Sequence, residues 1–228
     1  MAKHRIAWLP GDGVGKEVME AARIVLNALK FDAEYVHGDI GWEFWCKEGD
    51  PLPDRTVEML KTTDAALFGA ITSKPKEEAE KELVPELQGK GMSYSSPIVR
   101  LRQQFDLFAN MRPCKAYPGN PLNYRDDIDI VVFRENTEGL YVGLEFHPVP
   151  AEMLQMIAKH NKKGERFLQV APNDVAMSIR AFTREGCRRI VHRAFEYAQE
   201  QGRKHVTIVE KPNVIRETSG LMVREARK

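Results

Sequence analysis

The sequence is poor in cysteine. Its 228 residues include only Cys46, Cys114 and Cys187, an odd number of cysteines that lie far apart. This spacing excludes a disulfide framework and a closely spaced metal knuckle. We expect each cysteine to be a small buried apolar side chain, in a protein of the reducing cytoplasm.

Long apolar runs and an excess of one charge are also missing. No run approaches the roughly 18 apolar residues of a membrane span, and the N-terminal apolar segment 6–9 is too short for the core of a signal peptide. The 34 Lys and Arg residues nearly balance the 33 Asp and Glu residues, for a formal net charge of +1. This balance excludes the broad positive field of a non-specific nucleic-acid binder. We therefore expect neither a membrane nor a nucleic acid as a partner.

Short apolar segments alternate with helical periodicity in the first part of the chain. Strands are predicted at 5–9, 33–37 and 65–70, and helices at 16–29 and 56–60. Strands without polar alternation that are separated by helices are typical of a parallel sheet covered on both sides. The pattern predicts an α/β protein of one or two domains.

The rest of the chain is less regular. Segment 73–90 mixes charges of both signs and predicts a solvated loop or a short surface helix. Beyond it, the pattern predicts a helix at 97–106, a strand at 128–133, a long helix at 180–201 and a buried strand at 206–209. Segment 161–172 supports no prediction.

A glycine-rich loop, Gly11-Asp12-Gly13-Val14-Gly15, joins the first strand to the first helix. Its backbone N–H groups and the helix dipole could hold an anion there. The spacing does not match the G-x-G-x-x-G fingerprint of a Rossmann fold. A tight turn that needs the dihedral freedom of glycine is the favoured interpretation.

Four arginines in the middle of the chain are candidates for binding an anion. Arg100, Arg102, Arg112 and Arg134 lie in a helix, beside a turn or at the end of an apolar strand, where guanidinium groups can grip carboxylates or phosphates. A dense polar run from Arg134 to Tyr141 follows this strand, where α/β proteins place their sites.

Tyr141, at the end of the polar run, is a candidate for proton transfer. Lys211, which follows the predicted strand at 206–209, is the candidate cation that would lower the pKa of the tyrosine.

Five segments carry a resemblance that spans nearly the whole chain. They are Leu9–Glu17 (LPGDGVGKE), Phe68–Ser73 (FGAITS), Leu101–Arg102 with Asp106–Pro113 (DLFANMRP), Arg134–Tyr141 (RENTEGLY) and Lys211–Val214 (KPNV). In this order they resemble the successive motifs of the β-decarboxylating dehydrogenases, which include the isocitrate, homoisocitrate and 3-isopropylmalate dehydrogenases.

The resemblance implies a two-domain fold with a largely parallel sheet that is not a Rossmann fold. Residues 1–110 would form the N-terminal part of the large α/β domain, and residues 111–228 a small domain with substrate and dimer-interface elements. The implied reaction is the oxidation of a 2-hydroxy acid by NAD or NADP with Mg²⁺ or Mn²⁺, followed by loss of the β-carboxyl group as carbon dioxide. The implied assembly is a homodimer.

The resemblance also implies roles for individual residues. Arg102, Arg112 and Arg134 match the arginines that hold the carboxylates of the substrate. Tyr141 matches the tyrosine that protonates the enol after decarboxylation.

Three further residues match site positions of the family. Lys211 matches the lysine that accepts the proton of the hydroxyl group, often from the neighbouring subunit. Asn213 matches a nearby site asparagine, and Thr72 a residue beside the nicotinamide.

The substrate is predicted from the residues shortly before Arg102. Ser96 matches a substrate-binding serine of the isocitrate enzymes and favours conversion of isocitrate to 2-oxoglutarate, a step of the tricarboxylic acid cycle. Ile98 and Glu210 depart from the isocitrate pattern, so 3-isopropylmalate or homoisocitrate is the alternative.

In this family the metal-binding aspartates and the adenosine-binding loop lie downstream of the lysine motif. The chain is therefore predicted to be truncated at its C-terminus or to be one half of a split enzyme, and no metal ligand is assigned to it. Alone it is predicted to be inactive. An alternative of another class is a catalytically silent homologue that dimerises with a full-length partner.

Overall fold

A computed structural model describes residues 4–228 and divides into two compact units, the first ending at Arg100 and the second comprising Leu101–Lys228. The boundary predicted from the sequence lies ten residues later, after residue 110. Together the units form a mixed α/β structure with a parallel sheet, as the sequence predicts.

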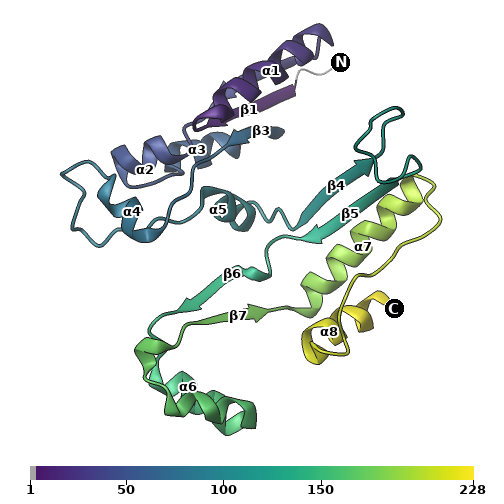
Figure 1. Ribbon diagram of the computed structural model, residues 1–228. Helices are drawn as coiled ribbons and strands as arrows, with labels where there is room; N and C mark the ends of the chain where they lie inside the picture. The colour runs from purple at the N-terminus through teal and green to yellow at the C-terminus, as the bar shows by residue number, and fades with distance from the viewer. Residues whose placement is uncertain (1–3) are drawn as a thin grey trace. The chain divides into compact units, whose positions relative to one another are not determined.

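The first unit alternates strands and helices (Figure 1). Its strands are β1 (His4–Gly11), β2 (Ala33–His37) and β3 (Ala65–Ala70). Its helices are α1 (Val14–Ala28), α2 (Trp42–Glu48), α3 (Asp54–Leu60) and α4 (Lys76–Lys81), and α5 (Pro97–Gln104) begins here. The three predicted strands are confirmed, and so are the helices predicted at 16–29 and 56–60.

The three strands form one parallel sheet in the order β2-β1-β3. Because β1 is paired on both sides, Ile6 to Leu9 are buried. The chain leaves β1 for β2 on one side and then returns to β3 on the other. The order of the strands therefore reverses between β1 and β3, and the carboxyl ends of these two strands are where open α/β sheets bind ligands.

Helices cover both faces of β1. The guanidinium of Arg23, on α1, lies 4.4 Å from the ring centroid of Trp8. Leu9 points to the opposite face because side chains alternate along a strand, and it gathers with Thr56 and Met59 of α3 around Gly38.

Two glycines allow the turn after β1 to approach β3. A Cβ atom on Gly15 would lie 2.2 Å from the carbonyl oxygen of Pro10, and one on Gly69 would lie 2.3 Å from the same oxygen. In the loop itself, the N–H of Asp12 donates to Ala70 O (2.7 Å) and the N–H of Gly15 donates to Asp12 O (2.8 Å). These backbone donors are thus used within the fold, which supports the tight-turn interpretation rather than an anion site.

The charged segment after β3 also contributes to a core. Ala79 and Leu83, in and just after α4, are buried against Trp42 and Trp45 of α2. The indole N–H of Trp45 donates to Ala79 O at 2.8 Å. The prediction of a short helix is confirmed, but its purely solvated character is wrong because one side of it packs on α2.

The second unit contains two antiparallel pairs of strands (Figure 1). β4 (Ala109–Lys115) pairs with β5 (Asp129–Glu135), and β6 (Gly139–Phe146) pairs with β7 (Met177–Ala181). The helices are α6 (Ala151–His160), α7 (Arg184–Glu200) and α8 (Arg216–Ala226), with 3₁₀ segments at Lys162–Gln169 and Pro172–Asp174. The parallel pairing predicted from the sequence is found in the first unit.

Two predictions for this unit need correction, and one segment without a prediction can be assigned. The long helix begins at Arg184 rather than at residue 180, because 177–181 pair in β7 and the Thr183 side chain caps the helix by accepting from Gly186 N at 2.9 Å. The predicted strand at 206–209 is wrong, since these residues join none of the described sheets. Segment 161–172 is largely 3₁₀ helix.

The cysteines differ from one another. Cys187 is buried, Cys46 is half-buried and Cys114 is exposed on β4, so burial of all three is a wrong prediction. Burial, reinforced by nearby carboxylates, raises the pKa of the Cys187 thiol to about 11. Because the thiolate is the reactive form, Cys187 is inert near neutral pH.

Across residues 4–228, no helix has both the length and the apolar character needed to cross a bilayer.

The close approach at Gly15 predicts that alanine is destabilising at this position but not at Gly220. We expect Gly15→Ala to lower the free energy of unfolding by about 1–3 kcal/mol, because the new methyl group collides with backbone atoms that cannot rotate away. Gly220→Ala, in α8, is the control. There the nearest atom is the flexible guanidinium of Arg224 at 3.2 Å, and alanine is the better helix former by about 1 kcal/mol. Urea denaturation measures both, and equal effects would contradict the packing interpretation.

Candidate functional site

The β4–β5 ladder brings two of the predicted substrate-binding arginines together. Asn110 pairs with Arg134, and Arg112 pairs with Val132. Arg112 and Arg134 are therefore diagonal neighbours on one face of the ladder. The next residue, Phe133, points to the other face and packs on Tyr197 of α7, with ring centroids 5.2 Å apart. The arginines thus occupy the face opposite α7.

Tyr141 lies beside two of the three arginines. Its ring centroid is 5.0 Å from the guanidinium carbon of Arg134 and 5.5 Å from that of Arg102. Gln103 holds the backbone at this point by donating from Nε2 to Tyr141 O at 3.1 Å. The second unit therefore places Arg102, Arg134 and Tyr141, which are separated in sequence, in one cluster, and we call these three residues with Arg112 the arginine–tyrosine cluster.

The electrostatics of the cluster favour an anion. Burial, followed by the positive charges of Arg134 and Arg112, lowers the pKa of Arg102, while Tyr141 opposes that change. The Nε atom of Arg134 is buried and has no hydrogen-bond partner among the described residues. Like charges held close together in partly buried positions are stabilised by a ligand of opposite charge, and guanidinium groups bind carboxylates in fixed geometry.

A buried amide fixes the guanidinium of Arg134. Asn136, only 5% exposed, accepts from Arg134 Nη2 at 3.1 Å and donates from Nδ2 to Leu107 O at 3.3 Å. Its two hydrogen bonds connect the end of β5 to the segment that leads into β4. The orientation of Arg134 is therefore set by the fold rather than by a ligand.

The polar run after β5 is held by an arginine that sequence reasoning missed. Arg189, on α7, donates to Thr137 Oγ1 (2.7 Å), Glu135 Oε1 (3.3 Å) and Asp106 (2.7 Å). Glu135 in turn accepts from the backbone N–H groups of Thr137 (2.8 Å) and Glu138 (2.6 Å).

The charges of this network support one another. Burial alone would lower the pKa of Arg189, but the hydrogen bonds and charges of Asp106 and Glu135 raise it. No local pattern in the sequence marks Arg189, because its contact with Glu135 joins residues that are 54 positions apart.

A second set of residues gathers at the carboxyl ends of β1 and β3. Thr72 follows β3 and is half-buried. Its N–H donates to Asp12 Oδ2 at 3.0 Å, and its carbonyl accepts from Tyr94 OH at 3.1 Å. Ser96 lies two residues beyond Tyr94, directly before α5, and is also half-buried. Thr72 thus stands at the strand-order reversal of the sheet, where a nucleotide is expected.

The remaining predicted residues lie apart from these sets. Lys211 and Asn213 are exposed, in the turn that leads to α8. No hydrogen bond, ion pair or ring contact joins them to the arginine–tyrosine cluster in the described part of the chain. Arg100, one of the arginines singled out in the sequence, instead binds Asp50 (2.7 Å) and Asp54 (3.2 Å) within the first unit. It braces the fold.

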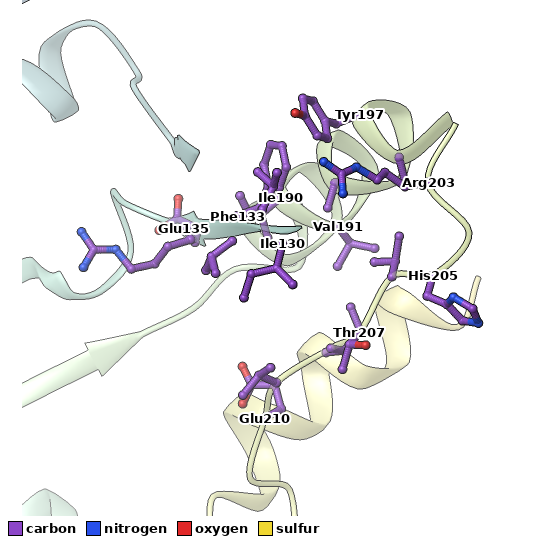
Figure 2. A pocket seen from close by; sticks show the side chains of 18 of the residues that line it. Ile130, Phe133, Glu135, Ile190, Val191, Tyr197, Arg203, His205, Thr207 and Glu210 are labelled. Atoms are coloured by element: carbon purple, nitrogen blue, oxygen red, sulfur yellow. The ribbon is translucent and has the colours of Figure 1, made fainter. Parts of the chain in front are cut away.

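A cavity of about 740 Å³ lies between β5, α7 and segment 203–210. Figure 2 shows Ile130 and Phe133 of β5 on one side and Thr207 of the segment on the other. Its lining is mainly apolar, so it does not suit a multiply charged acid. Within residues 4–228 no group of three or more histidine, cysteine or acidic side chains is placed to hold a metal ion. The residues present therefore do not fit a resident Mg²⁺ or Mn²⁺.

The fold is of the α/β type, and its second unit places two arginines beside one tyrosine. Comparison with known proteins specifies the class: residues 5–228 match the isocitrate/isopropylmalate dehydrogenase family, and the chain belongs to it. This confirms the resemblance seen in the sequence. The family consists of oxidative decarboxylating dehydrogenases.

Individual relatives place the chain within that family. It is 39% identical over 216 residues to the protein DlpA of Legionella pneumophila, covering 94% of this chain and 34% of DlpA. It is 39% identical over 221 residues to the 3-isopropylmalate dehydrogenase of Methanothermobacter thermautotrophicus, covering 97% and 54% of the two chains. The crystal structure of isocitrate dehydrogenase from Methylococcus capsulatus matches with a TM-score of 0.76 and 32% identity, covering 98% and 56%. The chain thus spans between a third and about half of the length of these proteins.

The network around Arg189 predicts a stability effect. We expect Arg189→Gln to lower the free energy of unfolding by about 2–3 kcal/mol, because it leaves the carboxylate of Glu135, whose side chain is 11% exposed, without its cation. Arg188→Gln is the matched control on the same helix. It removes an exposed pair with Glu185 and should leave stability nearly unchanged. Guanidinium denaturation of both variants makes the comparison, and a stable Arg189→Gln would argue against the network.

Proposed function

We propose that this chain binds the substrate of an NAD- or NADP-dependent dehydrogenase that oxidises and decarboxylates a 2-hydroxy acid, with isocitrate as the first candidate. The observation that carries the proposal is the arginine–tyrosine cluster, in which Arg102 and Arg134 lie within 5.5 Å of one tyrosine ring. Family membership supports the reaction class.

The arginines bind and orient the acid. Isocitrate carries three carboxylates, and Arg102, Arg112 and Arg134 supply three guanidinium groups whose mutual repulsion its binding relieves. Fixed forks of donors hold the carbon skeleton in one orientation. The β-carboxylate remains free to leave as carbon dioxide once the neighbouring carbon becomes a ketone.

Two groups of the chain move protons in this proposal. Lys211 accepts the proton of the C2 hydroxyl as the hydride leaves C2, and Tyr141 donates a proton to C3 after the carboxyl group is lost. Asn213, two residues from the lysine, contacts the same substrate. NAD or NADP supplies the hydride acceptor, and Thr72 lies beside its nicotinamide. Tyr141 is held for this role between two guanidinium groups, whose carbons lie 5.5 and 5.0 Å from its ring centroid.

The resemblance to the family also supports a division of roles along the chain. Residues 1–110 are proposed to belong to the large domain that carries the nicotinamide side, and residues 111–228 to the domain that carries the carboxylate and dimer contacts. Because the chain spans about half of the 3-isopropylmalate dehydrogenase relative, we propose that turnover needs further residues of such an enzyme, including its metal ligands. Three free thiols suit a reducing compartment such as the cytoplasm.

The candidate substrates differ in the substituent on C3. Ser96 favours isocitrate, because a hydroxyl can bind a third carboxylate. Ile98 favours an apolar substituent and so supports 3-isopropylmalate as the second candidate, with homoisocitrate as a further alternative. The name of the Methanothermobacter relative adds weight to isopropylmalate.

A binding panel tests the substrate. Isothermal titration of the chain with isocitrate, 3-isopropylmalate and homoisocitrate should show isocitrate bound most tightly. We expect Arg134→Gln to weaken that binding by about ten- to a hundredfold, because it removes a charge-assisted contact. Arg125→Gln is the control, since Arg125 is exposed and pairs only with Asp127. Binding confined to isopropylmalate would replace the first candidate by the second, and failure to bind any of the three acids would contradict the proposal.

We further propose a homodimer in which Lys211 of one chain serves Tyr141 of its partner, which is consistent with the absence of recorded contacts between them in the described part of one chain. The test uses a chimera that carries the remaining C-terminal residues of the Methanothermobacter relative. Tyr141→Phe and Lys211→Met should each lower kcat by at least about 100-fold.

Mixing the two inactive variants distinguishes shared from separate sites. If the residues meet across the interface, random reassociation restores about a quarter of the wild-type activity, since half of the dimers are mixed and each has one intact site. No recovery after confirmed subunit exchange would place both residues in one chain. If the unmodified chimera is inactive with all three acids, the silent dimerisation partner becomes the better hypothesis.

A further inference from the structure

We infer that Asp12 and Tyr94 are positioning residues that fix the backbone N–H and C=O of Thr72 and so present its hydroxyl to the nicotinamide cofactor. This inference rests on the proposed function, because it assumes that Thr72 contacts the cofactor. It assigns roles to an aspartate of the glycine-rich loop and to a tyrosine that neither the arginine–tyrosine cluster nor the sheet requires.

The first half of the fixation comes from Asp12. Its Oδ2 accepts from the N–H groups of Thr72 (3.0 Å) and Trp42 (2.7 Å), and Oδ1 accepts from Glu43 N (3.3 Å). One carboxylate therefore ties the loop after β1 and the start of α2 to the loop after β3. Three backbone donors converge on it, so its position is over-determined.

The second half comes from Tyr94. Its hydroxyl donates to Thr72 O at 3.1 Å, while its ring packs on Trp42 and Trp45 at centroid distances of 5.0 and 5.5 Å. Trp45 is only 1% exposed, so the ring rests on a rigid support. Burial raises the pKa of Tyr94, with a smaller contribution from the charge of Asp12 and an opposing one from Ser73, and the phenol is a proton donor at neutral pH.

Fixing both backbone polar groups of one residue matters because Thr72 lies outside any helix or strand. A loop peptide without such bonds samples several φ and ψ values, and a ligand must then select one of them. With N–H and C=O both used by the fold, the threonine side chain is the part of the residue left to meet a ligand. Its place at the carboxyl ends of β1 and β3 puts that side chain where this sheet type binds nucleotides.

The test compares conservative variants of the chimera described above, because the adenosine-binding loop of this family lies downstream of the lysine motif. Tyr94→Phe removes one hydroxyl and keeps the ring on the tryptophans, and Asp12→Asn keeps the shape but removes the charge. Tyr35→Phe is the matched control, since its hydroxyl is buried in the same unit and makes no hydrogen bond in the described structure. Thr72→Val removes the hydroxyl that the cofactor is proposed to meet.

Two readouts separate positioning from stability and from the proposed function. Hydrogen–deuterium exchange of the peptide covering 70–74 reports the fixation, and NADH fluorescence titration reports cofactor binding. We expect Tyr94→Phe and Asp12→Asn to speed exchange of this peptide and to weaken NADH about five- to tenfold, with unfolding midpoints for Tyr94→Phe near that of wild type. Tyr35→Phe should change neither readout. If Asp12→Asn fails to fold, Tyr94→Phe alone decides.

The outcomes are distinguishable. If Thr72→Val weakens NADH binding but Tyr94→Phe binds as wild type does, the positioning role is overturned while the cofactor contact stands. If Tyr94→Phe leaves the exchange rate unchanged, the fixation itself is refuted. If wild type binds no NADH, or Thr72→Val binds as wild type does, the cofactor contact in the proposed function fails and the positioning role fails with it.

Discussion

Repulsion between guanidinium groups is the constraint on which the second unit depends. Burial, followed by the charges of Arg134 and Arg112, lowers the pKa of Arg102, and in a flexible chain these like charges would move apart. The β4–β5 ladder prevents this for two of them, because paired backbones fix Arg112 and Arg134 as diagonal neighbours. The energy for the arrangement comes from the ladder and from Phe133 packing on α7, not from the site itself. The proposed affinity for an anion rests on this arrangement.

The first unit depends on a different constraint, which is the close approach of three backbone segments. The end of β1, the start of α1 and the end of β3 meet where a side chain on Gly15 or Gly69 would overlap with Pro10 O. Asp12 can reach the N–H of Thr72 because the glycines bring the two loops together. The glycine-rich loop therefore acts through packing and through one carboxylate, rather than through a free set of backbone donors. Binding chemistry at this end of the sheet depends on that packing.

These two arrangements differ in how far the sequence reveals them. β1, β2 and β3 follow from apolar runs, since burial on both faces leaves a local signature. Arg102, Arg134 and Tyr141 were found because each lies in a segment that resembles a family motif. Arg189 was not, because its partners are distant in sequence and a single arginine in an amphipathic helix resembles any solvated one. The same reason hid the pairing of Asp12 with Thr72, and an apolar run alone made 206–209 look like a strand although no described strand pairs with it.

The geometry of the arginine–tyrosine cluster also limits what it can discriminate. A dicarboxylate such as isopropylmalate would leave one guanidinium unmatched, which is costly only if that group is buried. Arg112 is exposed, so water can solvate it when no third carboxylate is present. The three cations therefore attract dianions and trianions alike and provide little selection between them. Selection has to come from neutral groups that meet the C3 substituent, since an unpaired buried hydroxyl or a buried carboxylate against a methyl group carries a penalty that water does not relieve. For this reason the proposed choice of substrate rests on Ser96 and Ile98 rather than on the arginines.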